Sequence, residues 1–398
     1  MVLWEKRLRR FASSMQAKNV PVMLRLWNGS EIKLGNSPRV TISTSSLAGL
    51  RHLLSPSLDR LGYAYVEGEL DVDGHVMDII DVAARLSSLA HGDKPSRSVL
   101  RLARHSRKQD ADDITYHYDV SNDFYALWLD RNMVYSCAYF QNEHDSLDTA
   151  QEQKMDHIFR KLRLRPGERL LDIGCGWGAL VMRAAEKFGV EAVGITLSQN
   201  QCELANERIR QRGLQDRCEV RIEDYRDVSG HFDRIASVGM FEHVGLKNLR
   251  GYFEKVDHLL APDGAALIHG ITSTDPDSAE TPWGGGEFID RYVFPNGELP
   301  HIGLVLKEMA AAGLEAMDVE SLRRHYAMTL GHWAERFDAA GDKIRQLVDE
   351  RTYRIWRVYL AGCAYGFQQN WISVHQILVT HGRGIQAMPL TRDDMYAY

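Results

Sequence analysis

The chain has 398 residues, of which 44% are hydrophobic and 26% are charged, and its net charge is −6. This length suits about two domains, and the composition excludes collagen-like, coiled-coil and wholly disordered chains. The negative total charge excludes nucleic-acid binding driven by bulk charge.

The cysteines and the apolar runs limit the cellular compartments in which the protein could act. The chain has five cysteines, an odd number, and no CxxC pair. This pattern disfavours a disulfide framework or a metal site and favours a reducing cytosol. The positively charged N-terminus has no continuous apolar core, and no apolar run approaches membrane-spanning length. If the protein acts on lipid, we expect it to be cytoplasmic and peripheral, on the inner face of the membrane.

Residues 1–90 are expected to form a small α+β domain for lipid binding or dimerisation. Apolar residues at helical spacing predict a helix over 1–18, and Asn28-Gly29 predicts a hairpin between two strands. The basic first helix has two interpretations, a helix lying on an anionic membrane or one packed on its own domain. The remaining predictions are strands at Val20–Trp27, Glu31–Leu34 and Val40–Thr44, helices at Leu47–Leu54 and Val76–Leu89, and an extended segment at Tyr63–Val72.

Residues 91–113 are predicted to be a basic linker. The segment is either a patch for lipid headgroups or a solvated connection. Its positive side chains are Lys94, Arg97, Arg101, Arg104, Arg107 and Lys108.

Residues 114–398 are expected to form an α/β domain with a parallel sheet, because predicted strands and helices alternate along them. Ligands gather beyond the carboxyl ends of the strands in such a sheet. The predicted strands are Arg169–Ile173, Ala192–Leu197, Cys218–Ile222, Ile235–Gly239 and Ala265–Ile271. The predicted helices are Ala179–Phe188, Asn200–Gln211, Asn248–Leu259 and residues 349–370.

A glycine-rich turn follows the first of these strands. Gly174 and Gly176 form a GxGxG pattern with Asp172 two residues before it, and these glycines allow close approach of a ligand to the backbone. A nicotinamide site would read GxGxxG, with an acid ending the second strand, where this chain has none. The pattern therefore favours S-adenosylmethionine over a dinucleotide. The alternative is a tight strand–helix turn without a ligand.

Polar residues after the next two strands complete the predicted cofactor site. Thr196 and Gln201 can bind the ribose hydroxyls in place of the missing acid. Asp224, after the third strand, can accept a hydrogen bond from the adenine amine.

Several motifs resemble those of the cyclopropane fatty acid synthase family, which includes the mycolic acid cyclopropane synthases. The resemblance covers nearly the whole chain. It rests on the segments Tyr116–Tyr125, Tyr135–Phe140, Gly194–Ser198, Phe241–Gly245 and Phe294–Gly297. It implies a Rossmann-like S-adenosylmethionine methyltransferase domain with a small N-terminal α+β domain.

The resemblance also implies which residues bind ligands. Cofactor contacts are expected from Tyr135, Ser136, Gly174, Gly176, Thr196, Leu197 and Gln201. The family holds a bicarbonate ion beside the transferred methyl group, and the matching positions are Cys137, Glu242, His269, Ile271 (through its backbone amide) and Tyr326. Gly270 departs from the family pattern, and we assign it no role.

Ordinary structural explanations exist for each member of this anion-binding set. Glu242 can be a helix N-terminal acid, His269 a core histidine and Cys137 a small buried hydrophobe. Tyr326 can simply close a core with its hydroxyl hydrogen-bonded. Their combination favours a site for the base that removes a proton from the new methyl group during ring closure.

The expected substrates are cis double bonds in the unsaturated acyl chains of membrane phospholipids. Residues 283–306, which include three glycines and several aromatic residues, are interpreted as a mobile loop and tunnel wall or as a packed insertion. Alternative functions are methylation that leaves a branch, methylation of a small-molecule amine, and a lipid-binding scaffold without catalysis. Because relatives dimerise through the small domain, we also expect a homodimer at an anionic membrane surface.

Overall fold

The computed structural model describes residues 3–91, 120–277, 286–294, 297–382 and 388–396. Most of the predicted linker, the first four residues of the segment Tyr116–Tyr125 and the glycines at 284–285 lie outside the described residues. None of the described helices combines the length and hydropathy needed to cross a membrane.

The N-terminal residues form a four-stranded sheet with helices against it. The predicted hairpin is confirmed, because β1 (Val22–Arg25) pairs antiparallel with β2 (Glu31–Lys33). On its other side β1 pairs in parallel with β3 (Val40–Thr44), which pairs antiparallel with β4 (Leu70–Asp73). The accompanying helices are α1 (Leu3–Ala17), α2 (Leu47–Leu54), α3 (Leu58–Val66) and α4 (Val76–His91).

Helix α1 packs on this domain through one face. Leu8, Ala12 and Met15 are buried in the domain core. The basic residues Lys6, Arg7, Arg9 and Arg10 are exposed. The apolar stripe is therefore occupied by the domain, as the packed interpretation requires.

The predicted extended segment Tyr63–Val72 is wrong over its first part, where the chain continues α3. Ser57 is the N-cap of that helix, and its side chain accepts a hydrogen bond from the backbone amide of Arg60. Leu61, Ala64 and Tyr65 are buried on the helix. Cap and burial together outweigh the β-propensity of the aromatic residues in this segment.

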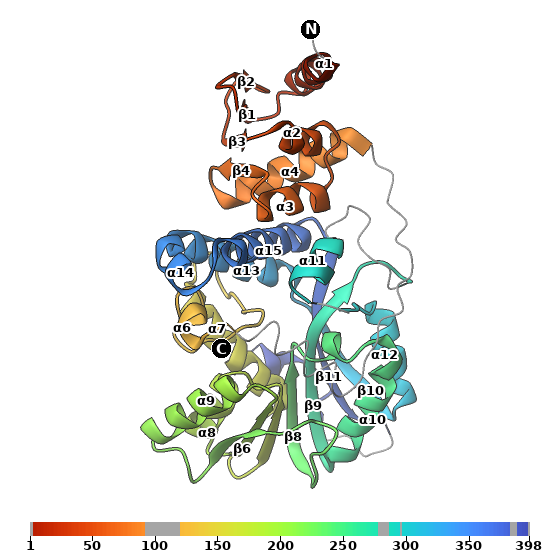
Figure 1. Cartoon of the computed structure of the whole chain (residues 1–398). Helices are drawn as coiled ribbons and strands as arrows, with labels where there is room; N and C mark the ends of the chain where they lie inside the picture. The colour runs from red at the N-terminus through yellow and green to blue at the C-terminus, as the bar shows by residue number, and fades with distance from the viewer. Residues whose placement is uncertain (1–2, 92–119, 278–285, 295–296, 383–387, 397–398) are drawn as a thin grey trace. The chain divides into compact units, whose positions relative to one another are not determined.

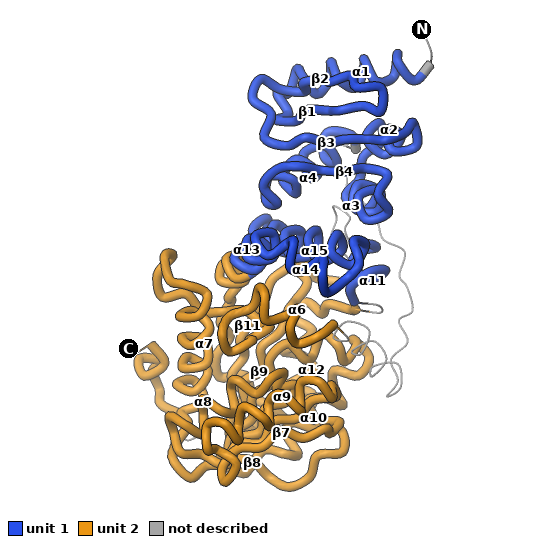
Figure 2. Tube along the Cα trace, turned by 60° about the vertical axis from the view of Figure 1, so that its left-hand side comes forward, with its two compact units in different colours: residues 1–99, 280–295, 330–369 blue, residues 100–279, 296–329, 370–398 orange. Residues whose placement is uncertain are grey.

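Contacts within the chain divide it into two compact units (Figure 2). Unit 1 comprises Met1–Val99, Glu280–Pro295 and Leu330–Gln369, and unit 2 comprises Leu100–Ala279, Asn296–Thr329 and Asn370–Tyr398. This division differs from the predicted boundaries, because later helices pack on the N-terminal ones. The later elements within unit 1 are α11 (Gly286–Tyr292), α14 (Gly341–Leu347), α15 (Glu350–Gln368) and part of α13 (Arg323–Ala339).

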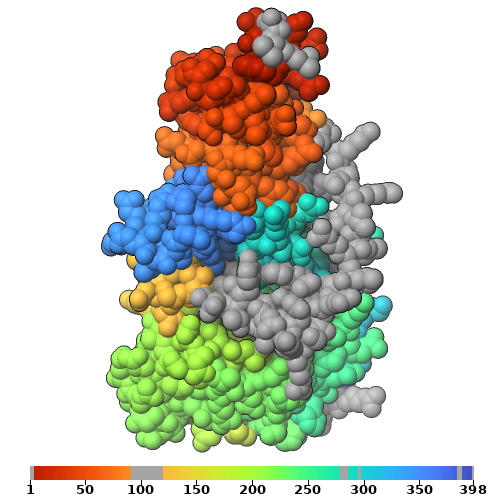
Figure 3. Space-filling model, in the orientation of Figure 1, coloured from red at the N-terminus to blue at the C-terminus, as the bar shows by residue number. Residues whose placement is uncertain are grey.

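Specific contacts fix these later helices within unit 1. The Arg354 side chain on α15 donates to the backbone carbonyl oxygens of Tyr65, at 2.8 Å, and Leu70, at 3.3 Å. The backbone amide of Phe288 on α11 donates to Asp59 at 3.0 Å. Figure 3 shows the result at the surface, where blue residues of the later helices adjoin the orange N-terminal residues.

Unit 2 is built on a seven-stranded sheet in the order β10-β11-β9-β8-β5-β6-β7 (Figure 1). The strands from β9 to β7 in this order run parallel, as predicted, whereas β11 pairs antiparallel with both β9 and β10. The strands are β5 (Arg169–Ile173), β6 (Glu191–Thr196), β7 (Cys218–Ile222), β8 (Phe232–Val238), β9 (Leu260–Ser273), β10 (Leu314–Ser321) and β11 (Ile372–His381).

Helices cover both faces of this sheet. Figure 1 shows α8 and α9 on one side and α10 and α12 on the other. The helices of the unit are α6 (Asn122–Ala126), α7 (Leu147–Leu162), α8 (Ala179–Phe188), α9 (Gln199–Gln211), α10 (Leu249–Leu259) and α12 (Ile302–Ala311). Short 3-10 turns are η1 (Phe241–His243), η2 (Leu246–Asn248) and η3 (Asp393–Met395).

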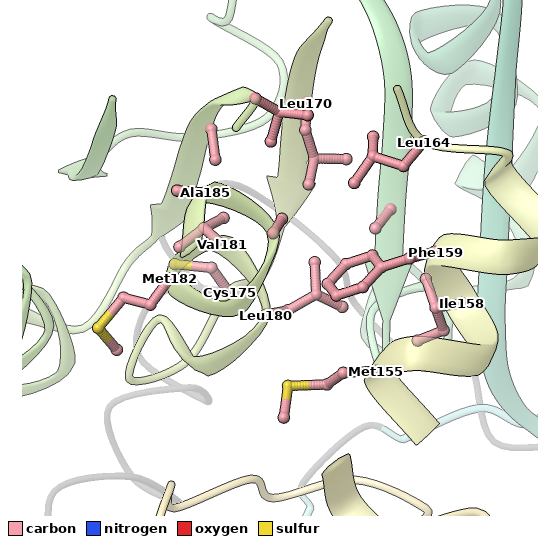
Figure 4. Packing of buried hydrophobic residues seen from close by; sticks show 14 of the residues in the cluster. Met155, Ile158, Phe159, Leu164, Leu170, Cys175, Leu180, Val181, Met182 and Ala185 are labelled. Carbon is pink, nitrogen blue, oxygen red and sulfur yellow. The ribbon is translucent and has the colours of Figure 1, made fainter. Parts of the chain in front are cut away.

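The strand residues alternate between two cores. Leu170 belongs to the cluster under α7 and α8, whereas Leu171 belongs to the cluster under α10 and α12. Figure 4 shows the first cluster, in which Phe159 of α7 and Leu180 of α8 pack together beside β5. Strands with two buried faces expose ligand-binding groups only at their ends. The order of strands reverses at β5, so its carboxyl end is the expected place for a ligand.

Candidate functional site

The predicted glycine turn connects β5 to α8. Gly174 and Gly176 have positive φ angles of +79° and +54°, which favour glycine. A Cβ on Gly174 would lie 2.6 Å from Cγ of Met240, whereas a Cβ on Gly176 would meet no atom within 4 Å. The turn is thus packed on one side and open on the other.

The open side faces a cavity of about 150 Å³ in unit 2. All nine residues predicted for the cofactor line it: Tyr135, Ser136, Asp172, Gly174, Gly176, Thr196, Leu197, Gln201 and Asp224. They come from the carboxyl ends of β5 and β6, from the first turn of α9, from the segment after β7 and from the segment before α7. The tertiary structure therefore brings residues up to 89 positions apart to one cavity.

Asp172 is the buried acid of this cavity. It is 3% exposed, and its carboxylate has no hydrogen bond to the described residues. Burial raises the pKa of Asp172 to about 7, and the charge of Lys154 opposes this rise. A buried carboxylate without a partner is matched by a ligand that brings hydrogen-bond donors or positive charge.

The residues predicted to contact the ribose and the adenine differ in their hydrogen-bond partners. The Thr196 hydroxyl donates to the Gln201 side-chain oxygen at 2.8 Å, so the Gln201 amide nitrogen is the group with no partner among the described residues. Asp224 is held by the side chain of Arg226, with distances of 2.8 Å and 2.6 Å. An adenine contact by Asp224 would therefore share this carboxylate with a guanidinium group.

These groups fit S-adenosylmethionine. Asp172 offers an acceptor for an ammonium group, Gln201 a donor for hydroxyl oxygens, and Gly176 a surface that a flat ligand can approach closely. When bound, the cofactor would supply an electrophilic methyl group.

Glu242 lies behind one wall of the cavity. Gly239 lines the cavity, and a Cβ built on it would lie 3.8 Å from Oε1 of Glu242. The same oxygen accepts the backbone N–H of Ile271 at 3.4 Å, while Oε2 is buried without a partner among the described residues. Burial raises the pKa of Glu242 to about 7.

His269 is held in place by a residue that sequence reasoning missed. Gly239 donates its backbone N–H to the His269 carbonyl oxygen at 2.8 Å. The Gln376 side-chain amide donates to Nδ1 of His269 at 3.2 Å, and Nε2 has no partner among the described residues. Burial lowers the pKa of His269 well below its usual range. The ring is therefore neutral, and its proton is on Nε2.

The sequence contains a pattern that could have indicated a role for Gln376. It is a polar residue flanked by apolar residues in a buried strand, and it is paired with His269 across β11 and β9. This pattern indicates a role for Gln376 only once the pairing of β11 with β9 is known.

Cys137 and Tyr326 are brought together through Leu322. The Cys137 thiol lies 3.8 Å from the Leu322 carbonyl oxygen, which also accepts the Tyr326 backbone amide at 3.0 Å. Burial raises the pKa of Cys137 well above its usual range, so the thiol stays neutral. None of the five residues predicted for the anion is in the cavity lining, and their roles remain predictions.

Gly270, the departure from the family pattern, has a structural reason in this chain. A Cβ at this position would lie 2.4 Å from the Phe241 ring and 2.7 Å from Oε2 of Glu242. The absence of a side chain makes room for the buried acid. No role was expected for this position from the sequence, and its close approach to Phe241 and Glu242 gives it one.

Comparisons with known proteins identify relatives over most of the chain. The sequence profile of a family described as mycolic acid cyclopropane synthetase matches residues 105–377, and that of a domain of unknown function, DUF7884, matches residues 12–94. A probable fatty acid methyltransferase of Pseudomonas putida is 46% identical over 393 residues, which are 98% of this chain and 100% of that protein. The cyclopropane-fatty-acyl-phospholipid synthase of Escherichia coli is 41% identical over 266 residues, or 67% of each chain.

A solved structure of a mycolic acid cyclopropane synthase, complexed with SAH and CTAB, matches with a TM-score of 0.65 and 36% identity. The match covers 70% of this chain and 99% of that one. The first profile spans more than half of the sequence, and the relatives share both the fold and the cofactor chemistry expected of the cavity. The chain therefore belongs to the family of cyclopropane fatty acid and mycolic acid cyclopropane synthases and is an S-adenosylmethionine-dependent methyltransferase.

Proposed function

We propose that the protein transfers the methylene of the S-adenosylmethionine methyl group to cis double bonds in the acyl chains of membrane phospholipids. The product is a cyclopropane ring, and bound bicarbonate is the base. The observation that carries this proposal is that two of the residues predicted for the anion each keep a buried group without a partner among the described residues, Oε2 of Glu242 and Nε2 of His269. A small anion with one acidic hydrogen would complement both.

The chain's own groups have distinct roles in this proposal. His269 donates a hydrogen bond from Nε2 to the anion. The backbone amide of Ile271 donates only a weak hydrogen bond of 3.4 Å to Glu242, so it can donate to the anion as well. An ionised Glu242 accepts the hydrogen of bicarbonate, which points a basic oxygen towards the methyl group. Cys137 and Tyr326 are proposed to complete the site.

Alignment accounts for a large part of the rate in this proposal. An alkene is a weak nucleophile, so it must be oriented against the methyl group in a space from which water is excluded. The apolar walls of the cavity, built from Ile173, Val238 and Met240 among others, favour such exclusion.

A second product is favoured by one comparison. The Pseudomonas putida relative, which matches over the whole chain, is named a probable fatty acid methyltransferase. Methylation without ring closure would leave a methyl branch on the acyl chain. The complete anion set favours the ring over a saturated branch, because ring closure requires a base at the new methyl group whereas a saturated branch requires a hydride donor.

Mass analysis of the product distinguishes these outcomes. Purified enzyme would be incubated with labelled S-adenosylmethionine and liposomes that contain a cis-monounsaturated phospholipid. A ring adds CH2 and removes the ozone-sensitive double bond, whereas a saturated branch adds CH4. An unsaturated branch adds CH2 and stays sensitive to ozone. Either branched product would overturn ring closure, and the absence of any lipid product would overturn the proposed substrate.

We also propose that the protein acts as a peripheral homodimer on anionic membranes. Flotation with anionic and zwitterionic vesicles tests the membrane part, with Arg101→Glu and Arg104→Glu combined as the variant. The control combines Arg210→Glu and Arg324→Glu, at two exposed arginines outside the linker. Vesicle binding is expected to fall for the linker variant (Arg101→Glu with Arg104→Glu) and not for the control. Equal vesicle binding by the two double variants would contradict the role of the linker in membrane binding. Light scattering that gives a monomer mass would contradict the dimer.

A further inference from the structure

The cofactor cavity contains a buried lysine that the expected contacts do not use. Lys154 on α7 is 2% exposed and lines the cavity. Its ammonium group donates to Oγ of Ser136 at 2.9 Å, and it has no other polar partner among the described residues. Lysines are almost never fully buried without a partner of opposite charge. A buried ammonium group without an ion pair to a described residue therefore points to a ligand.

The same cavity holds a buried charge of the opposite sign. Asp172 and Lys154 both line it, but neither forms an ion pair with the other or with another described residue. Burial lowers the pKa of Lys154 to about 8 and raises the pKa of Asp172 to about 7, so each charge is disfavoured without a ligand. A zwitterionic ligand would satisfy both groups at once.

We propose that Lys154 binds the carboxylate of the methionine part of S-adenosylmethionine, while Asp172 binds its ammonium group. This inference rests on the assignment of the cavity to that cofactor. One hydrogen of the Lys154 ammonium group is used by Ser136, which leaves two for a carboxylate. Because Ser136 accepts from the lysine, its own hydroxyl hydrogen can be donated to the same carboxylate.

The surrounding helix supports this arrangement. Gln151, one turn before Lys154 on α7, donates its side-chain amide to the backbone carbonyl oxygens of Ser136, at 2.8 Å, and Val134, at 3.2 Å. Residues three apart on a helix lie on one face. The two side chains together hold the segment that leads from the cofactor cavity to Cys137. Binding of the carboxylate would thus also fix one side of the proposed anion site.

The test measures binding of three ligands to the full-length protein by calorimetry. S-adenosylhomocysteine has both charged groups, its decarboxylated analogue has only the ammonium group, and methylthioadenosine has neither. Lys154→Met is expected to weaken binding of S-adenosylhomocysteine by about 10- to 100-fold, the size of a lost charged hydrogen bond. Its affinity for the other two ligands should change less than about twofold. Asp172→Asn should weaken the binding of both ligands that carry the ammonium group.

Equal losses for all three ligands in Lys154→Met would overturn the proposal, because they would mean a general structural role. Unchanged binding of S-adenosylhomocysteine would overturn it too. The control is Lys187→Met, at a lysine that pairs with Asp156 at 2.9 Å and is not in the cavity lining. It should change none of the three affinities.

A milder variant keeps the test decisive if Lys154→Met does not fold. Ser136→Ala removes a single hydroxyl group and should weaken S-adenosylhomocysteine selectively, by about tenfold or less. A loss that is equal for the decarboxylated ligand would contradict the carboxylate assignment. These measurements need no lipid, so they can succeed even if the proposed product is wrong. Failure of the wild type to bind S-adenosylhomocysteine would instead refute the cofactor assignment.

Discussion

Gln376 donates its side-chain amide to Nδ1 of His269 at 3.2 Å, and both residues lie opposite each other on β11 and β9. An amide nitrogen only donates, so Nδ1 must accept and the ring proton must be on Nε2. This relationship determines which side of His269 can donate a hydrogen bond to a ligand.

Replacing Gln376 by Glu should reverse that arrangement. A carboxylate accepts from Nδ1–H, which leaves Nε2 as an acceptor that repels an anion. We expect turnover to fall by about tenfold or more, the equivalent of one lost hydrogen bond. Nitrogen-15 NMR of the histidine would report the changed tautomer. Gln215→Glu, at an exposed position, is the control, and unchanged turnover in Gln376→Glu would show that the tautomer is irrelevant.

Replacing Gly270 by Ala should displace Glu242. The added methyl group would overlap the Phe241 ring and approach Oε2 of Glu242 to 2.7 Å. We expect a loss of about 1–3 kcal/mol in the free energy of unfolding, together with reduced turnover. Gly251→Ala on α10 is the matched control, because no atom lies within 4 Å of its added Cβ. That control should be neutral or more stable by roughly 0.5–1 kcal/mol, and identical behaviour of the two variants would refute the packing argument.

Replacing Glu242 by Gln should change how stability depends on pH. The folded pKa of about 7 lies above the ordinary value of 4.5, so the folded state retains a proton that the unfolded state releases. The wild type therefore loses stability as pH rises from about 4.5 to 7, by up to about 3 kcal/mol, and this loss is complete above pH 7. Denaturant unfolding at pH 5 and pH 8 should show a smaller loss in Glu242→Gln than in the wild type, while the loss due to Asp172, whose pKa is also raised to about 7, persists in both.

The same variant should lose turnover by on the order of 100-fold, because its amide cannot accept the bicarbonate hydrogen in the same way. Glu254→Gln, at an exposed site on α10, should alter stability by less than about 0.5 kcal/mol at either pH. Full turnover of Glu242→Gln would disprove the proposed role of the acid.

Replacing Gly176 by Ala should impair cofactor binding beyond its effect on folding. Gly176 and Gly167 both have positive φ angles, +54° and +81°, and neither has an atom within 4 Å of an added Cβ. Each alanine should therefore destabilise the fold similarly, by about 1–2 kcal/mol. Only Gly176 lines the cavity, so only its variant should bind S-adenosylhomocysteine less tightly, by about tenfold. Equal affinities in the two variants would place the cofactor elsewhere.

The sequence alone predicted the parts of the site that depend on local order along the chain. Asp172 lies near the end of a buried strand, and Gly174 and Gly176 lie between that strand and a helix, so their order requires a tight turn at the edge of the sheet. Thr196 is the last residue of the second strand of the same parallel set, and Asp224 follows the third. Parallel strands end at one edge, so predicting the strands was enough to predict that these residues meet.

Residues whose meaning depends on non-local pairing could not be predicted in this way. Gln376 acts on His269 only because β11 pairs with β9, and Gly270 matters only because Phe241 and Glu242 pack over it. Lys154 looks like any helical lysine until burial and Ser136 give it a role. The extended segment expected over Tyr63–Val72 failed similarly, because burial of α3 outweighed the strand preference of its residues.

The sequence by itself thus determined the α/β order, the glycine turn and the residues at the strand ends, because these follow from short-range patterns of hydrophobicity and backbone freedom. The tertiary structure decided which buried charges lack partners, which nitrogen of His269 carries the proton and which late helices join the N-terminal unit. Burial and hydrogen bonding between distant residues set those features, and no local pattern encodes them.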